Sequence, residues 1–135
     1  MAKVYIAGSY SGRKRIGEEA IKLSQRGFTI LSRWLDDNDF IEQAWDSNFG
    51  GRVAETMAMS DTFAIFNADL VILDTIDKSS TGGSDTELGI ALTRELDRKV
   101  HIVHIGPYRN IFQTLVKEHY PTWNAFFTVY DARIQ

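Results

Sequence analysis

The sequence predicts one α/β domain in which helices cover both faces of a doubly wound, parallel sheet of five strands. Two observations lead to this prediction. Short apolar segments rich in β-forming residues alternate with segments of helical periodicity, an order typical of parallel strands joined by right-handed crossovers. The length of 135 residues fits one domain over residues 1–135, with no internal repeat or linker.

The first half of the chain predicts two strands, a helix between them and a loop. The apolar segment 3–8 is expected to form a buried first strand. Apolar residues at helical spacing follow, and Gly27 is a natural stop for that helix. Residues 28–34 are expected to form the second strand, and the acidic stretch 35–50, which has no clean period, a long loop.

The second half is expected to add three more strand segments to the sheet. In chain order the expected elements are a helix (51–67), a strand (69–74), a loop (75–83), a helix (84–97), a strand (100–106), a short helix (110–118) and a last strand in "AFFTVYD" (125–131).

Composition excludes several classes of function. The net charge of −3 and the pI near 5.6 argue against a nucleic-acid partner, because phosphate binding needs clustered Lys and Arg. The absence of cysteine excludes disulfides, thiolate nucleophiles and Cys-ligated metals. No apolar run reaches membrane-spanning length and no signal-peptide pattern is visible, so we expect no membrane partner and a cytoplasmic protein.

The three histidines do not indicate a metal site. His101, His104 and His119 show no metal-ligand spacing with acidic residues and are interpreted as structural. We therefore expect neither a metal nor another cofactor.

Three loops are candidates for a ligand site, because ligands of such sheets bind beyond the carboxyl ends of the strands. The loops follow the first, third and fourth strands, at 8–13, 74–84 and 106–110. The first carries four residues suited to a monophosphate: Gly8, Ser9, Ser11 and Arg13. The alternative is a Gly/Ser turn with a solvated arginine. The G-x-G-x-x-G dinucleotide pattern is absent.

Glu87 has two interpretations. "SDTE" from Ser84 is the pattern of a capping box, with Ser84 as N-cap and Glu87 three residues later. Glu87 also lies in the first turn of a helix at the ligand edge of the sheet, where the helix dipole favours an anion. A carboxylate held on rigid backbone there is suited to act as a nucleophile.

Asp61 lies in an unusual place. On the helix expected over 51–67, four residues fall on one narrow stripe: Ala54, Ala58, Asp61 and Ile65. An acid in the middle of an apolar stripe is either paired with backbone donors or held in a partly dry functional site. Met59, Phe63 and Phe66 form a second apolar side, which suggests a subunit contact or an intramolecular one.

Three sequence segments resemble the nucleoside 2-deoxyribosyltransferase family, which includes N-glycosidases of 2'-deoxynucleoside 5'-monophosphates. They are "VYIAG" with Tyr5, "SDTFAIFNADLVILD" with Asp61, and "TGGSDTELGIAL" with Glu87. "TGGSDTE" is also similar to the G-G-x-x-T-x-x-E loop of phosphoribohydrolases, with spacing that differs by one. The resemblance implies a flavodoxin-like sheet of five parallel strands.

The resemblance also implies roles. Glu87 would attack the anomeric carbon to form a covalent deoxyribosyl-enzyme, Tyr5 would orient Glu87, and Asp61 would assist the leaving base. Transfer to another base or to water would follow, without a cofactor. Active sites shared in a homo-oligomer are implied too, with 106–112 and the C-terminal "VYD" as the segments that reach across.

The expected partner is a small nucleoside or nucleotide. "GSYSGR" resembles the phosphate loop of the monophosphate glycosidases, which favours a 5'-monophosphate. Asp85 departs from relatives that have a neutral residue there; it would raise the cost of ionising Glu87 or bind a sugar hydroxyl. The expected substrate-binding residues are Gly8, Ser9, Ser11, Arg13, Asp74, Gly83, Asp85 and Asn110. The alternative function is a sequestering protein that binds nucleotides without turnover.

Overall fold

A parallel sheet organises the computed structural model, which describes residues 2–35, 52–78, 82–97 and 99–134. Its five strands follow the order β2-β1-β3-β4-β5, and every pairing is parallel. This confirms the predicted doubly wound architecture. The strands are β1 (Lys3–Ala7), β2 (Thr29–Ile30), β3 (Leu70–Asp74), β4 (His101–Ile105) and β5 (Glu118–Tyr120).

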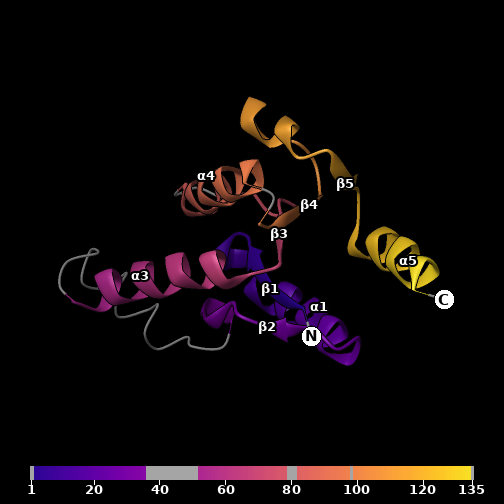
Figure 1. The fold of residues 1–135 in the computed structure, drawn as a ribbon, viewed down its shortest axis with the longest axis horizontal. Coiled ribbons are helices and arrows are strands. Elements are labelled where there is room, and N and C mark those ends of the chain that lie inside the picture. Colours follow the sequence, from indigo (N-terminus) through magenta and orange to yellow (C-terminus); the bar gives the residue numbers. More distant parts are fainter. Residues whose placement is uncertain (1, 36–51, 79–81, 98, 135) are drawn as a thin grey trace.

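Helices cover both faces of the sheet. They are α1 (Arg13–Gln25), α3 (Arg52–Asn67), α4 (Gly83–Leu96) and α5 (Trp123–Arg133), with short 3₁₀ helices at Tyr10–Gly12, Arg33–Leu35 and Ile111–Leu115, the last called η3. Figure 1 shows α3 and α4 together on one side of the central strands, with α1 and α5 on the other. An ion pair between Arg26 and Asp131, at 2.7 Å, joins α1 to α5. No described helix is both long and apolar enough to cross a bilayer.

The register of the sheet decides which helices each side chain meets. Tyr5 of β1 lies beside Val71 of β3, and side chains at paired positions point to the same face. Tyr5 reaches α4, whereas Asp74, three residues beyond Val71, reaches α1 and α5. Two acids near the same edge of the sheet are therefore separated onto opposite faces.

The predicted last strand at 125–131 is wrong, because these residues belong to α5. The Thr122 hydroxyl accepts a hydrogen bond from the Ala125 amide at 3.1 Å and caps this helix. The buried residues Trp123, Phe126 and Phe127 recur at helical spacing, so the aromatic run covers the sheet from one face. The edge strand is β5 instead, and the short helix expected over 110–118 is reduced to η3.

The second strand is also shorter than predicted. Only Thr29 and Ile30 pair with β1, and a 3₁₀ turn then carries Trp34 into the core. The Trp34 indole N–H donates to the Ile6 carbonyl at 2.8 Å, so this tryptophan is structural. Most of the loop predicted at 35–50 lies outside the described residues.

Candidate active site

Tyr5 and Glu87 meet between β1 and α4. Tyr5 is fully buried, and its hydroxyl donates a hydrogen bond to the Glu87 carboxylate. Glu87 itself is partly exposed. A strand in the centre of the sheet therefore positions the hydroxyl, and the first turns of α4 bring the carboxyl to it.

Asp61 joins this pair from α3. It lies one turn before Ile65, which is fully buried against the core, and Asp61 itself is partly exposed. Burial raises the pKa of Asp61 from 3.8 to about 6, and a hydrogen bond from Tyr5 opposes that rise. The structure thus brings the three predicted catalytic residues together: Tyr5, Asp61 and Glu87.

Glu87 is the more strongly perturbed acid. Burial raises its pKa from 4.5 to about 8, the Tyr5 hydrogen bond lowers it, and the charge of Asp61 raises it further. Burial, reinforced by both carboxylates, also raises the pKa of Tyr5. The perturbation of Glu87 thus comes from burial and Asp61, and the predicted effect of Asp85 on it is not among its causes.

The single hydroxyl of Tyr5 influences the protonation state of Asp61 and Glu87. A phenol has one hydrogen to donate and lone pairs that accept. The Tyr5 hydroxyl can donate to only one ionised carboxyl. The second carboxyl can then hydrogen-bond to the phenol oxygen only if it is protonated and donates its own proton. The arrangement therefore favours a state in which Asp61 and Glu87 together hold one proton. In such a state one carboxyl is ionised, as a nucleophile must be, and the other can donate a proton.

Glu87 is not part of a capping box. The N-cap of α4 is Gly82, which has a φ of +77° and offers no side-chain cap, and Ser84 is buried inside the helix. Glu87 therefore lies five residues beyond the cap and not three. The capping interpretation is therefore wrong. The hydrogen bond that the structure describes for Glu87 is the one from Tyr5.

The first loop gathers several polar groups at the same edge. The hydroxyls of Ser9 and Ser11 lie 2.8 Å apart. The Arg13 guanidinium stacks 4.4 Å above the Tyr10 ring, and its buried Nη1 finds no hydrogen-bond partner among the described residues. A Cβ on Gly8 would lie 2.7 Å from a methyl of Ile16, so glycine is needed there. An anion is the natural partner for this set, and phosphate binding here stays a prediction.

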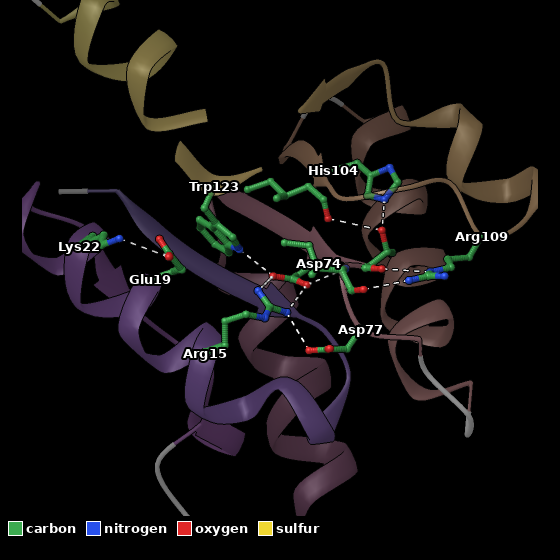
Figure 2. Close-up of polar contacts among 11 residues, drawn as sticks. Arg15, Glu19, Lys22, Asp74, Asp77, His104, Arg109 and Trp123 are labelled. Carbon is green, nitrogen blue, oxygen red and sulfur yellow. Dashed lines mark hydrogen bonds and ion pairs between the residues drawn. The ribbon is translucent and has the colours of Figure 1, made fainter. Parts of the chain in front are cut away.

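Asp74 makes several hydrogen bonds within the protein. Arg15 of α1 donates two hydrogen bonds to its carboxylate, both at 2.9 Å. The Trp123 indole donates another at 2.7 Å and the Ile76 amide a fourth at 3.0 Å. Figure 2 shows Arg15 between Asp74 and Asp77, with Trp123 approaching from α5. These contacts give Asp74 a structural role, and its predicted contact with a substrate stays a prediction.

Asp85 and Asn110 contact each other. The Asn110 side-chain amide donates to Asp85 Oδ1 at 3.1 Å, and the Gln113 amide donates to the same oxygen at 3.1 Å. Gly83 begins α4 and is exposed, with open space around it. A substrate contact by these residues remains untested.

Two of the three histidines, His104 and His119, lie side by side with their ring centroids 4.8 Å apart. His104 is fully buried and hydrogen-bonds Thr75 at 2.7 Å; burial, then His119, lowers its pKa to about 4. His101 is exposed and pairs with Glu118. Among the described residues no three His, Asp or Glu side chains are grouped so as to hold a metal.

Several structural partners were not predicted. The sequence patterns predict no role for Arg15, Trp123 or Gln113. Arg15 and Trp123 lie 59 and 49 residues from Asp74, so no local pattern connects them. For Gln113 the one available signal was a polar residue inside the apolar stretch "IFQTL".

Comparison with known proteins supports the fold. No family model matches the chain, and no curated protein matches its sequence. The structure is similar to that of a CMP N-glycosidase of Clostridium botulinum, BcmB. The TM-score is 0.61 at 18% identity, and the match covers 96% of this chain and 98% of that one. The likeness confirms the flavodoxin-like α/β fold that the sequence motifs implied.

Proposed function

We propose that the protein belongs to the nucleoside 2-deoxyribosyltransferase family and cleaves the N-glycosidic bond of a 2'-deoxynucleoside or its 5'-monophosphate. The observation that carries this proposal is the hydrogen bond from buried Tyr5 to Glu87, beside a second acid with a raised pKa. An acid and a carboxylate in one partly dry site are the two groups that glycoside cleavage needs.

Each group has a defined task in the proposed reaction. A Glu87 oxygen attacks the anomeric carbon while the bond from that carbon to the base nitrogen breaks. The bonding electrons leave with the base, and Asp61 gives its proton to the base. Tyr5 donates to the other Glu87 oxygen and holds the carboxylate in place. The product is a sugar ester of Glu87 and a free base.

The second half restores the enzyme. Water or a second base attacks the same carbon, the ester bond to Glu87 breaks, and Asp61 takes up the proton released by the acceptor. Hydrolysis and transfer use the same residues, so the acceptor that enters the site decides between them.

A monophosphate is the substrate that the first loop favours. Arg13 has a buried N–H group that finds no partner in the described part of the chain, and the hydroxyls of Ser9 and Ser11 lie beside one another. A dianionic phosphate would satisfy such donors. The neighbour BcmB is named for its action on a nucleoside monophosphate, CMP. A substrate of this kind is consistent with a cytoplasmic enzyme.

We also propose that the protein forms a homo-oligomer. Phe63 and Phe66 of α3 are 60% and 51% exposed, and Ile111 of η3 is 77% exposed. Large apolar side chains exposed on α3 and η3 favour a subunit contact. Light scattering coupled to size-exclusion chromatography tests this: a monomer at all concentrations would refute it.

Chromatography of released base tests the proposed function. The wild-type protein is incubated with ribo- and deoxynucleosides and their 5'-monophosphates, with and without a second base. Glu87→Gln should release none, whereas Glu95→Gln, the same change later in α4, should act as the wild type. Release without an acceptor means hydrolysis, and new nucleosides only with a second base mean transfer. Binding without release from any substrate would replace the proposal by sequestration.

A further inference from the structure

We infer that Asp85 is a positioning residue that fixes the first turn of α4 and, through it, the Glu87 carboxyl. The inference rests on the proposed function of Glu87. It assigns Asp85 to a contact within the protein instead of the expected contact with the sugar.

The start of α4 has no side-chain cap of its own. Gly82 is the N-cap, and the Thr86 amide and hydroxyl both bond to the Gly82 carbonyl, each at 3.0 Å. A glycine N-cap has no side chain that could accept from the amides of the first turn. A contact with another part of the chain can therefore fix the turn that carries the proposed nucleophile.

Asp85 makes that contact with two oriented amides. Asn110 and Gln113 both donate to Asp85 Oδ1, at 3.1 Å each. The carbonyl oxygen of Asn110 accepts from the Phe112 and Gln113 amides, and that of Gln113 from the Arg109 amide. With the oxygens occupied in this way, each NH₂ group must face Asp85.

The segment that supplies these amides is itself anchored. Gln113 is only 2% exposed. Arg109 donates to the backbone carbonyls of Thr75 and Ile76, at 3.1 and 2.9 Å, as Figure 2 shows. Asp85 therefore holds α4 against a part of the chain that is tied to the end of β3.

Helix geometry links Asp85 to Glu87. Residues two apart lie about 200° around an α-helix, so the two acids occupy opposite flanks of α4. Glu87 contacts Tyr5 on one flank, and Asp85 contacts η3 and the residue before it on the other. Rotation of the first turn about its axis would move both contacts together. Losing the Asp85 contact therefore lets the Glu87 carboxyl shift away from Tyr5.

The effect of Asp85 is one of geometry. The causes that raise the pKa of Glu87 are burial and Asp61. Asp85→Asn keeps an Oδ1 that both amides can reach, so it should keep kcat within about two-fold of wild type. Asp85→Ala removes the acceptor. Its kcat for base release should fall about 10- to 100-fold with little change in KM, as expected of a misplaced reacting group.

A second pair of variants tests the contact from its other side. Gln113→Glu places a carboxylate against Asp85 and should lower kcat as Asp85→Ala does. In the double variant Asp85→Asn/Gln113→Glu, the asparagine amide can donate to the new carboxylate. The hydrogen bond is then restored with its roles exchanged, and kcat should recover.

Hydrogen exchange of the backbone amides of 83–88 completes the test, because it needs no substrate. Protection should fall in Asp85→Ala and Gln113→Glu and return in the double variant. If the wild type releases no base but exchange changes in this way, the proposed function fails and the placement of α4 by Asp85 stands. Unchanged exchange and kcat in Asp85→Ala would overturn the inference. So would Asp85→Asn being as impaired as Asp85→Ala, which would indicate a charged contact with substrate.

Discussion

Asp74 and Glu87 are acids on opposite faces of one sheet, and they differ in how their charge is balanced. Asp74 is 2% exposed and accepts four hydrogen bonds, two of them from Arg15. Glu87, among the described residues, accepts one, from Tyr5, and its pKa is raised to about 8. Asp74 is satisfied within the protein. Glu87 lacks such compensation, and that leaves its carboxylate able to react with a ligand.

The comparison shows how to separate structural from functional acids. Burial alone does not distinguish them, because both acids contact the core. The number and charge of the donors do, because a guanidinium neutralises a carboxylate and an indole adds a further hydrogen bond, whereas a single hydroxyl leaves the charge uncompensated. Substitutions at Glu87, Asp74 and Tyr5 test this distinction.

The largest effect is expected for catalysis by Glu87→Gln. The amide keeps the size of the side chain and cannot act as a carboxylate nucleophile, so kcat should fall by about a thousand-fold or more. Initial rates of base release, measured beside Glu95→Gln, give the result. Turnover within about ten-fold of wild type would remove Glu87 from the reaction.

Asp74→Asn should lower stability more than any change at the two proposed catalytic acids. The NH₂ group of the introduced asparagine would face the N–H donors of Arg15 and Trp123, so two donors would oppose each other. Arg15 would also lose the negative charge of its buried partner. The free energy of unfolding should fall by about 2–4 kcal/mol. Urea unfolding measures it, with Asp77→Asn as control. Asp77 is 41% exposed and contacts the same Arg15, so its loss should cost less than about 1 kcal/mol. Equal effects of the two changes would contradict the contrast.

Tyr5→Phe removes the hydroxyl that contacts both proposed catalytic acids, Asp61 and Glu87. The rate of base release should fall about 100-fold, as on loss of one well-placed donor. The hydrogen bond from Tyr5 lowers the pKa of both Asp61 and Glu87, so its removal should move the whole pH–rate profile to higher pH. A profile that stays in place would show that the hydroxyl does not contact these acids in solution.

Glu87→Gln should also make the protein more stable. Folding raises the pKa of Glu87 from 4.5 to about 8, so over this range the folded chain holds a proton that the unfolded chain releases. Stability of the wild type is therefore lost as the pH rises through this range. At pH 8 the variant should gain about 1–2 kcal/mol, or roughly 3–8 °C in Tm. Melting curves at pH 4.5 and 8 test this, and a lower Tm at pH 8 would contradict it.

Part of this architecture could be predicted from local sequence. Apolar β-forming runs correctly predicted β1, β3 and β4, and helical spacing predicted α1, α3 and α4. The strand predicted at 125–131 was wrong because Phe126, Phe127 and Tyr130 have high β propensity and favoured a strand. The cap at Thr122 and their helical spacing favour a helix instead.

Some features of the candidate site could also be predicted from the sequence, and others could not. Asp61 could be suspected because an acid in an apolar stripe is rare, and the resemblance to a known family connected it with Tyr5 and Glu87. The role of Asp74 could not be predicted, because Arg15 and Trp123 reach it from distant parts of the chain. The contact of Asp85 with Gln113 joins α4 to η3 across 28 residues and has no sequence pattern either.

The central claim is that Asp61 and Glu87 share one proton when the site is active. The pH dependence of kcat/KM for base release between pH 5 and 9 tests it most directly. Because the pKa values are raised to about 6 and about 8, we predict a bell with its maximum near pH 7. Below about pH 6 both acids are protonated and Glu87 cannot attack, and above about pH 8 both are ionised and Asp61 has no proton to give. Between these limits the pair holds one proton, and the form that carries it on Asp61 is the one that reacts. A rate that is constant across this range would contradict the account.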